Sequence, residues 1–119
     1  MTDNMIELAK RAVACKGWRW SSGMLWLVKR AAPLEDYAGR AVLGYTRPHE
    51  AMPVLTDPAT VGCLLALVRV AYADPYASVW YSSDHGHSGD RWSFYSKALC
   101  FSGHASEAEA LVAALEAAL

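Results

Sequence analysis

The order of helical and strand-like segments in the sequence predicts an α+β domain, in which a mainly antiparallel sheet of four to five strands packs with three helices. Segments 57–72 and 106–118 begin with clear helix-capping residues, and short alternating segments elsewhere are typical of strands. The 119-residue chain is 54% hydrophobic and 19% charged, which is enough apolar material for one core. We therefore expect a single α+β domain over residues 1–119.

The most strongly marked helix is predicted over about residues 58–72, as the central buried helix of the domain. Asp57 can accept hydrogen bonds from the free amides of the first turn, and Pro58 suits the first helical position because its missing N–H is not needed there. Pro75 ends the helix. Only Arg69 is charged after the entry turn, so we expect the helix to be buried on most sides.

One face of this helix is built from small residues, namely Ala59, Gly62, Ala66 and Ala73, with Arg69 among them. Glycine inside a helix costs about 1 kcal/mol relative to alanine, so Gly62 is expected to permit the close approach of another backbone. The favoured neighbour is the sheet or the first helix of the same chain. The alternative is a homodimer or partner contact at this stripe.

Two further helices are predicted near the ends of the sequence. The first runs from about residue 5 to 16, with Asn4 as its cap and Gly17 as its stop. The last runs from residue 107 to about 118, after a capping box that Ser106 opens. It is rich in alanine, the best helix former.

The strands of the N-terminal half are predicted as a hairpin of residues 18–20 and 24–29, followed by a strand at 41–46. Residues 31–40 are expected to form an exposed connection, and residues 47–53 an irregular one.

The strands of the C-terminal half are predicted at residues 77–82 and 91–97, joined as a hairpin by the loop 84–90. Apolar and polar residues alternate cleanly in the second strand, as in a strand that is buried on one face. Residues 99–101 are expected to add a short strand.

Charge and hydropathy restrict the classes of partner and the location. The net charge of −1 gives no electrostatic footprint for nucleic acid or for an anionic membrane surface. The N-terminal residues lack the pattern of a signal peptide, and no apolar run approaches the roughly 20 residues that a membrane span needs. A cytoplasmic protein without a membrane or nucleic-acid partner is therefore expected.

Three cysteines, Cys15, Cys63 and Cys100, are widely spaced among apolar neighbours. We expect free, buried thiols in a reducing compartment. The alternative is a nucleophile, for which only Cys100 has a histidine nearby in sequence, His104.

The loop 84–90 holds the densest group of side chains that could perform chemistry. His85 and His87 could present two imidazoles to one metal ion, with Asp84 or Asp90 as a further ligand. Two glycines in the loop oppose the order that a metal site needs. We therefore favour a solvated polar loop and expect no cofactor.

The tryptophans, five in number, are expected mainly to fill the core between sheet and helices. Those that remain exposed could form part of a protein interface, in which Trp, Tyr and Arg are enriched. The candidate interface residues are Arg19, Trp20, Tyr81, Arg91 and Tyr95. Aromatic and basic residues on a sheet could also stack on nucleobases, but the net charge opposes this alternative. Phosphate-loop, dinucleotide and triad signatures are absent from the sequence, so no enzyme is expected.

Three blocks of the sequence resemble small accessory proteins of tailed bacteriophages and prophages, a family without an assigned activity. These blocks are Ala12–Met24, with its Cys-Lys-Gly-Trp-Arg-Trp run, Leu55–Arg69 and Ser106–Ala118. The chain departs from that pattern at Ser21-Ser22 and at Val70-Ala71-Tyr72. The resemblance implies a phage or prophage origin and transfers no catalytic residue.

The function expected from these observations is that of a non-enzymatic phage accessory protein. It would bind and inhibit a host protein, such as a component of a bacterial defence system, in the manner of an anti-CRISPR protein in the host cytoplasm. The first alternative is a protein that binds or sequesters a small nucleotide signal through Trp or Tyr stacking and Arg contacts to phosphate. A metal-dependent enzyme at His85 and His87 is the least favoured alternative.

Overall fold

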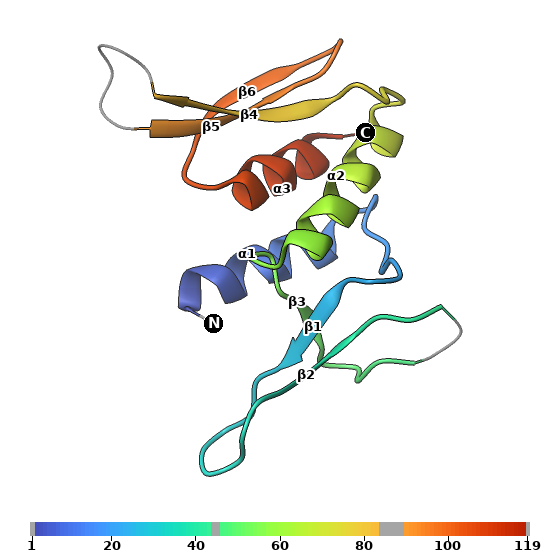
Figure 1. The fold of residues 1–119 in the computed structure, drawn as a ribbon, viewed down its shortest axis with the longest axis vertical. Helices are drawn as coiled ribbons and strands as arrows, with labels where there is room; N and C mark the ends of the chain where they lie inside the picture. Colours follow the sequence, from blue (N-terminus) through green and yellow to red (C-terminus); the bar gives the residue numbers. More distant parts are fainter. Residues whose placement is uncertain (1, 44–45, 84–89, 119) are drawn as a thin grey trace.

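Three helices form the middle of the molecule and separate two small antiparallel sheets (Figure 1). The computed structural model describes residues 2–43, 46–83 and 90–118. The helices are α1 (Asp3–Ala14), α2 (Pro58–Ala71) and α3 (Glu107–Ala117). The strands are β1 (Leu25–Val28), β2 (Tyr37–Arg40), β3 (Met52–Pro53), β4 (Ser78–Ser83), β5 (Asp90–Tyr95) and β6 (Cys100–His104).

The α+β class is confirmed, but the predicted single sheet of four to five strands is wrong. Within the described residues there are two three-stranded sheets, ordered β2-β1-β3 and β4-β5-β6, and every strand pair is antiparallel. The two sheets lie apart because α2 carries the chain from β3 at one end of the molecule to β4 at the other (Figure 1).

The predicted hairpin of residues 18–20 with 24–29 does not form. The guanidinium of Arg19 donates to the backbone oxygens of Lys16 and Trp18, at the end of the first helix. Trp18 is buried, and its ring meets that of Trp20 edge-on, with 5.4 Å between the ring centres. The alternation of this segment therefore reflects packing after α1 and not a strand.

The first sheet instead pairs β1 with β2 and with β3. Residues 31–40, predicted as an exposed connection, contain β2, and residues 47–53 contain β3. The segment 41–46 was predicted as a strand, but its described residues form none.

In the register of the sheet, Trp26 lies opposite Gly39, and a side-chain carbon added at Gly39 would come within 2.6 Å of the indole. The indole therefore occupies the space above this glycine.

The start of α2 is joined to the first sheet by one carboxylate. Asp57 is the N-cap, as predicted, and accepts from the backbone N–H and the hydroxyl of Thr60 at 3.0 and 2.9 Å. The same carboxylate accepts two hydrogen bonds from Arg40 at the end of β2. The Thr60 hydroxyl oxygen also accepts from the backbone N–H of Leu25 in β1, at 2.8 Å.

The prediction that α2 is buried on most sides is wrong. Its buried residues are Thr60, Leu64 and Val68, whereas Val70 is 79% exposed. The stripe of small residues also faces outward, and a side-chain carbon added at Gly62 would meet nothing within 4 Å. The prediction that the small residues of this stripe pack against the chain's own sheet or first helix is therefore wrong, and the alternative, a homodimer or partner contact, stays a prediction.

The core lies between the three helices and the inner face of the second sheet. Phe94 and Leu64 are fully buried there, and Phe94 meets the ring of Tyr72 with 5.3 Å between centres. Both α1 and α3 bury alanines, and four of these are 0% exposed: Ala9, Ala12, Ala110 and Ala114. Thr2, and not Asn4, caps α1 by accepting from the backbone N–H of Met5. α3 begins at its predicted cap, Ser106.

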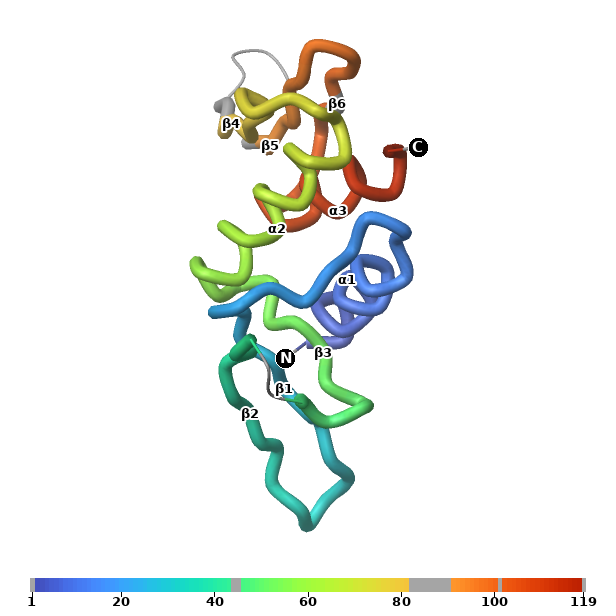
Figure 2. The backbone as a smooth tube through the Cα atoms, turned by 90° about the vertical axis from the view of Figure 1, so that its right-hand side faces the viewer, coloured from blue at the N-terminus to red at the C-terminus, as the bar shows by residue number. Residues whose placement is uncertain are grey.

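The molecule is elongated, with dimensions of 47 × 32 × 21 Å. Its radius of gyration is 15.1 Å, against about 13.5 Å for a compact domain of this length. Figure 2 shows the reason: the segment containing β1 and β2 extends beyond the helices at one end. Among the described residues, no helix has the length and apolarity needed to cross a membrane.

Alanine substitutions at Gly62 and Gly39 should change stability in opposite directions. Gly62→Ala removes the cost of glycine in an exposed helix, so the free energy of unfolding should rise by about 1 kcal/mol. Gly39→Ala should lower it by about 1–3 kcal/mol, because the new methyl group displaces the Trp26 indole. Urea denaturation measures both changes, and a stabilised Gly39→Ala variant would contradict the packing described.

The Asp57 carboxylate should make stability depend on pH. Hydrogen bonds from Arg40, together with those from Thr60, hold the pKa of Asp57 well below its ordinary value. A carboxyl group whose pKa is lowered by folding contributes stability above the unfolded pKa of about 4, and this contribution is lost as the pH falls further. The stability difference between the wild type and Asp57→Asn should therefore be constant from about pH 5 to 7 and shrink below about pH 4.

Urea denaturation at a series of pH values measures this difference. Arg40→Gln removes the main cause of the lowered pKa and should weaken the same pH dependence. An unchanged profile in Arg40→Gln would show that the ion pair is not its source.

Candidate functional site

The sheet β4-β5-β6 is covered on one face only. α3 packs against the face that carries Phe94, which is fully buried. No described helix or strand lies over the opposite face (Figure 1). We call this opposite side the open face.

Strand alternation and register identify the residues of the open face. Val79 pairs with Phe94 on the covered face, so their neighbours along each strand point the other way. In the same register Trp80 lies opposite Ser93, and Tyr95 lies between Ser78 and Cys100. The described side chains of the open face are those of Ser78, Trp80, Arg91, Ser93, Tyr95 and Cys100.

Two large aromatic side chains dominate this surface. Trp80 is 61% exposed and Tyr95 is 45% exposed. The indole N–H of Trp80 donates to the hydroxyl of Ser78 on the same strand, at 2.9 Å, which fixes the orientation of the ring. Ser93 lies between these side chains on the open face and is only 6% exposed.

Arg91 supplies the charge among the described side chains of the open face. Its guanidinium donates to the backbone oxygen of Gly103 in β6, at 3.4 Å. The strand pairing of β5 with β6 shifts register between Trp92 and Phe94, and Gly103 adopts a φ of +86° at this irregularity. The irregular register thus brings a carbonyl oxygen within reach of Arg91.

Asp74 fixes the position of this sheet relative to α2. Its buried carboxylate accepts from the backbone N–H groups of Lys97 and Tyr76, at 2.9 and 3.0 Å. These donors lower the pKa of Asp74. Arg69 of α2 also donates to the backbone oxygen of Ala77, at 2.8 Å. The open face is therefore held rigidly at the C-terminal end of the helix.

The structure separates the five residues predicted for an interface. Arg91 and Tyr95 lie together on the open face, whereas Tyr81 lies on the other side of the same sheet, against Trp92. Arg19 and Trp20 belong to the segment between α1 and β1 and are not part of this sheet. The guanidinium of Arg19 donates to the backbone oxygens of Lys16 and Trp18 in that segment.

Trp80 is the residue that sequence reasoning missed, because the tryptophans were assigned mainly to the core. Of the five, Trp18 is buried and Trp80 is exposed, with Trp20, Trp26 and Trp92 between these extremes. The usable signal was the alternation of β4: once Val79 faces the core, Trp80 must face away from it.

The described residues give little support to the two chemical alternatives, a metal site and a cysteine nucleophile. His85 and His87 lie outside the described residues, and elsewhere no group of three His, Cys, Asp or Glu side chains could hold a metal ion. Cys100 is exposed, contrary to the expectation of a buried thiol. In the register of β5 with β6, Cys100 lies opposite Tyr95 and His104 lies opposite Trp92. His104 faces Glu109 of α3 at 3.8 Å. The cysteine and this histidine thus lie at opposite ends of β6.

Comparison with known protein families, with curated protein sequences and with solved structures found no match to this chain. The functional argument therefore rests on the geometry of the open face and on the residues themselves.

Removal of the open-face aromatic rings should leave the fold intact. Trp80→Ala and Tyr95→Ala should each change the free energy of unfolding by less than about 1 kcal/mol, because both side chains are largely solvated. Phe94→Ala, on the covered face of the same sheet, should cost about 3–5 kcal/mol. Urea denaturation compares the three variants. A comparable loss in Trp80→Ala would mean that its ring contributes to the core.

Proposed function

We propose that this chain is a non-enzymatic binding protein whose open face docks onto another protein. The observation that carries the proposal is the exposure of Trp80 and Tyr95 beside Arg91 on a sheet face that no described element covers. Trp, Tyr and Arg are the residue types that most often dominate the binding energy of protein interfaces.

The exposed aromatic area is large enough to matter energetically. A tryptophan offers roughly 250 Å² of surface, so Trp80 at 61% exposure leaves about 150 Å² in water. Covering that area corresponds to about 3–4 kcal/mol at 25 cal/mol per Å², before the costs of association. The hydrogen bond to Ser78 already orients the indole, which reduces the entropy that binding would cost.

The chemistry of the open face also defines its partner. The partner surface should offer an apolar recess for the rings of Trp80 and Tyr95. A sheet face with aromatic rings and an arginine could also stack on single-stranded nucleic acid. The net charge of −1 favours a protein partner instead.

The kind of target follows from the sequence resemblance alone. A phage or prophage accessory protein acts inside the bacterial host, and a component of a host defence system is the target that we propose. Binding at the open face would inhibit that component by occupying its surface, without any chemical step by this chain.

Affinity capture from a nuclease-treated bacterial lysate tests the proposal. The wild type should retain a stoichiometric host protein, and the Trp80→Ala/Tyr95→Ala double variant should lose it. Tyr81→Ala is the matched control, because it removes an exposed aromatic ring from the same strand but from the other face. It should retain the partner, provided that its melting temperature shows a folded protein.

Two results would count against the open face as the docking surface. One is equal capture by the wild type and the folded double variant. The other is a partner that is captured from an untreated lysate but not from the nuclease-treated one, which would point to bound nucleic acid.

A further inference from the structure

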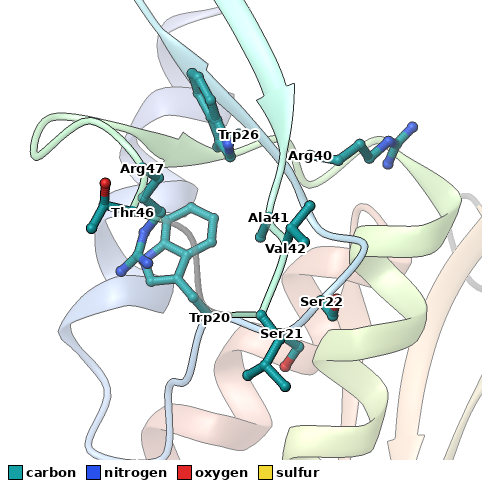
Figure 3. A pocket seen from close by; sticks show the side chains of 10 residues that line it. Trp20, Ser21, Ser22, Trp26, Arg40, Ala41, Val42, Thr46 and Arg47 are labelled. Atoms are coloured by element: carbon teal, nitrogen blue, oxygen red, sulfur yellow. The ribbon is translucent and has the colours of Figure 1, made fainter.

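A cavity of about 260 Å³ lies beside the first sheet (Figure 3). The first sheet and the open face are at opposite ends of the molecule (Figure 1). Its walls come from three parts of the chain: the segment after α1, the strands β1 and β2, and the residues that follow β2. The lining residues on which the inference depends are Trp20, Trp26, Arg40, Thr46 and Arg47.

Arg47 and Trp20 form the most distinctive feature of this cavity. The guanidinium carbon of Arg47 lies 4.3 Å from the centre of the Trp20 ring, and Figure 3 shows the two side chains against each other. Trp20 is in turn held edge-on against the buried Trp18. The cation is therefore placed by a ring that is itself fixed.

The charge of Arg47 is not neutralised by the part of the chain that the structure describes. No hydrogen bond or ion pair to a described residue satisfies its guanidinium, and burial lowers its pKa. Arg40 differs, because its guanidinium is occupied by Asp57. Both charged side chains that line the cavity are thus cations, but only that of Arg47 is available to a ligand.

We propose that this cavity binds a small flat organic anion, an aromatic ring or base that carries one phosphate or carboxylate. Arg47 would take the anionic group, since a planar guanidinium donates in parallel to carboxylate and phosphate oxygens. The indole of Trp26, which also lines the cavity, supplies an aromatic surface for the ring. The volume of about 260 Å³ lies just below the roughly 300–1,000 Å³ of typical ligand pockets, so one ring or base with one anionic group fits better than a dinucleotide.

Isothermal titration calorimetry on the full chain tests this site with adenosine 5′-monophosphate and benzoate as the two flat anions. At least one of them should bind. Adenosine and inorganic phosphate, which each lack one half of the proposed ligand, should bind at least about tenfold more weakly.

Variants at two arginines assign the binding to the cavity. Arg47→Gln should weaken the bound anion at least about tenfold, and Arg47→Lys, which keeps the charge but not the planar fork, should weaken it less. Arg30→Gln is the matched control and should bind like the wild type. Arg30 also stacks on an aromatic ring, that of Tyr37 at 4.7 Å, but it does not line the cavity.

The site is overturned if neither anion binds at millimolar concentration, if adenosine or phosphate binds as tightly as the better anion, or if folded Arg47→Gln retains full affinity. Each of these results leaves the open face unaffected, because the cavity and that face share no residue.

Discussion

The carboxylate of Asp57 is the interaction on which the arrangement of the first sheet depends. It caps α2, pairs with Arg40 of β2 and binds the hydroxyl of Thr60, whose oxygen in turn accepts from β1. Thr60 is completely buried, so its hydroxyl would cost the full desolvation penalty if it had no hydrogen-bond partner. β2 is largely exposed and β3 has two residues, so this sheet has little buried surface of its own to hold it in place.

A second carboxylate plays the corresponding part at the other end of α2. Asp74 binds the turns before β4 and after β5, and Arg69 binds the start of β4. The helix therefore acts as a spacer with one sheet fastened at each end. This geometry explains why the open face and the cavity lie far apart, and why each could engage its own ligand without a contact between the two.

The parts of the fold that could be predicted are those with local signals. The caps at Asp57 and Ser106 and the alternation of β5 depend on neighbours in sequence, and the structure confirms these elements. β2 could not be predicted, because its Tyr-Ala-Gly-Arg sequence has weak strand preference. It forms through contacts across the sequence, the indole of Trp26 over Gly39 and the pairing of its final arginine with the α2 cap.

The candidate site also has a part that could be predicted from the sequence and a part that could not. Alternation alone placed Arg91 and Tyr95 on an outer face, which the register of β5 bears out. The face of Trp80 depends on which side of the sheet α3 covers, and that choice is made by packing between residues that are far apart in the sequence. Arg19 was assigned to a strand because Trp18-Arg19-Trp20 alternates, whereas its guanidinium donates to backbone oxygens of the segment that follows α1.

The fully buried alanines of α1 and α3 have a consequence for how this protein can diverge. A larger side chain at Ala9, Ala12, Ala110 or Ala114 would have no room and would disturb the helical middle of the molecule, because all four are completely buried. The exposed rings of the open face and Arg47 in the cavity carry no such restriction, so binding preferences can change while the helical middle stays the same. Distant relatives of this chain will therefore be recognised by the spacing of small residues in two helices sooner than by any residue that touches a ligand.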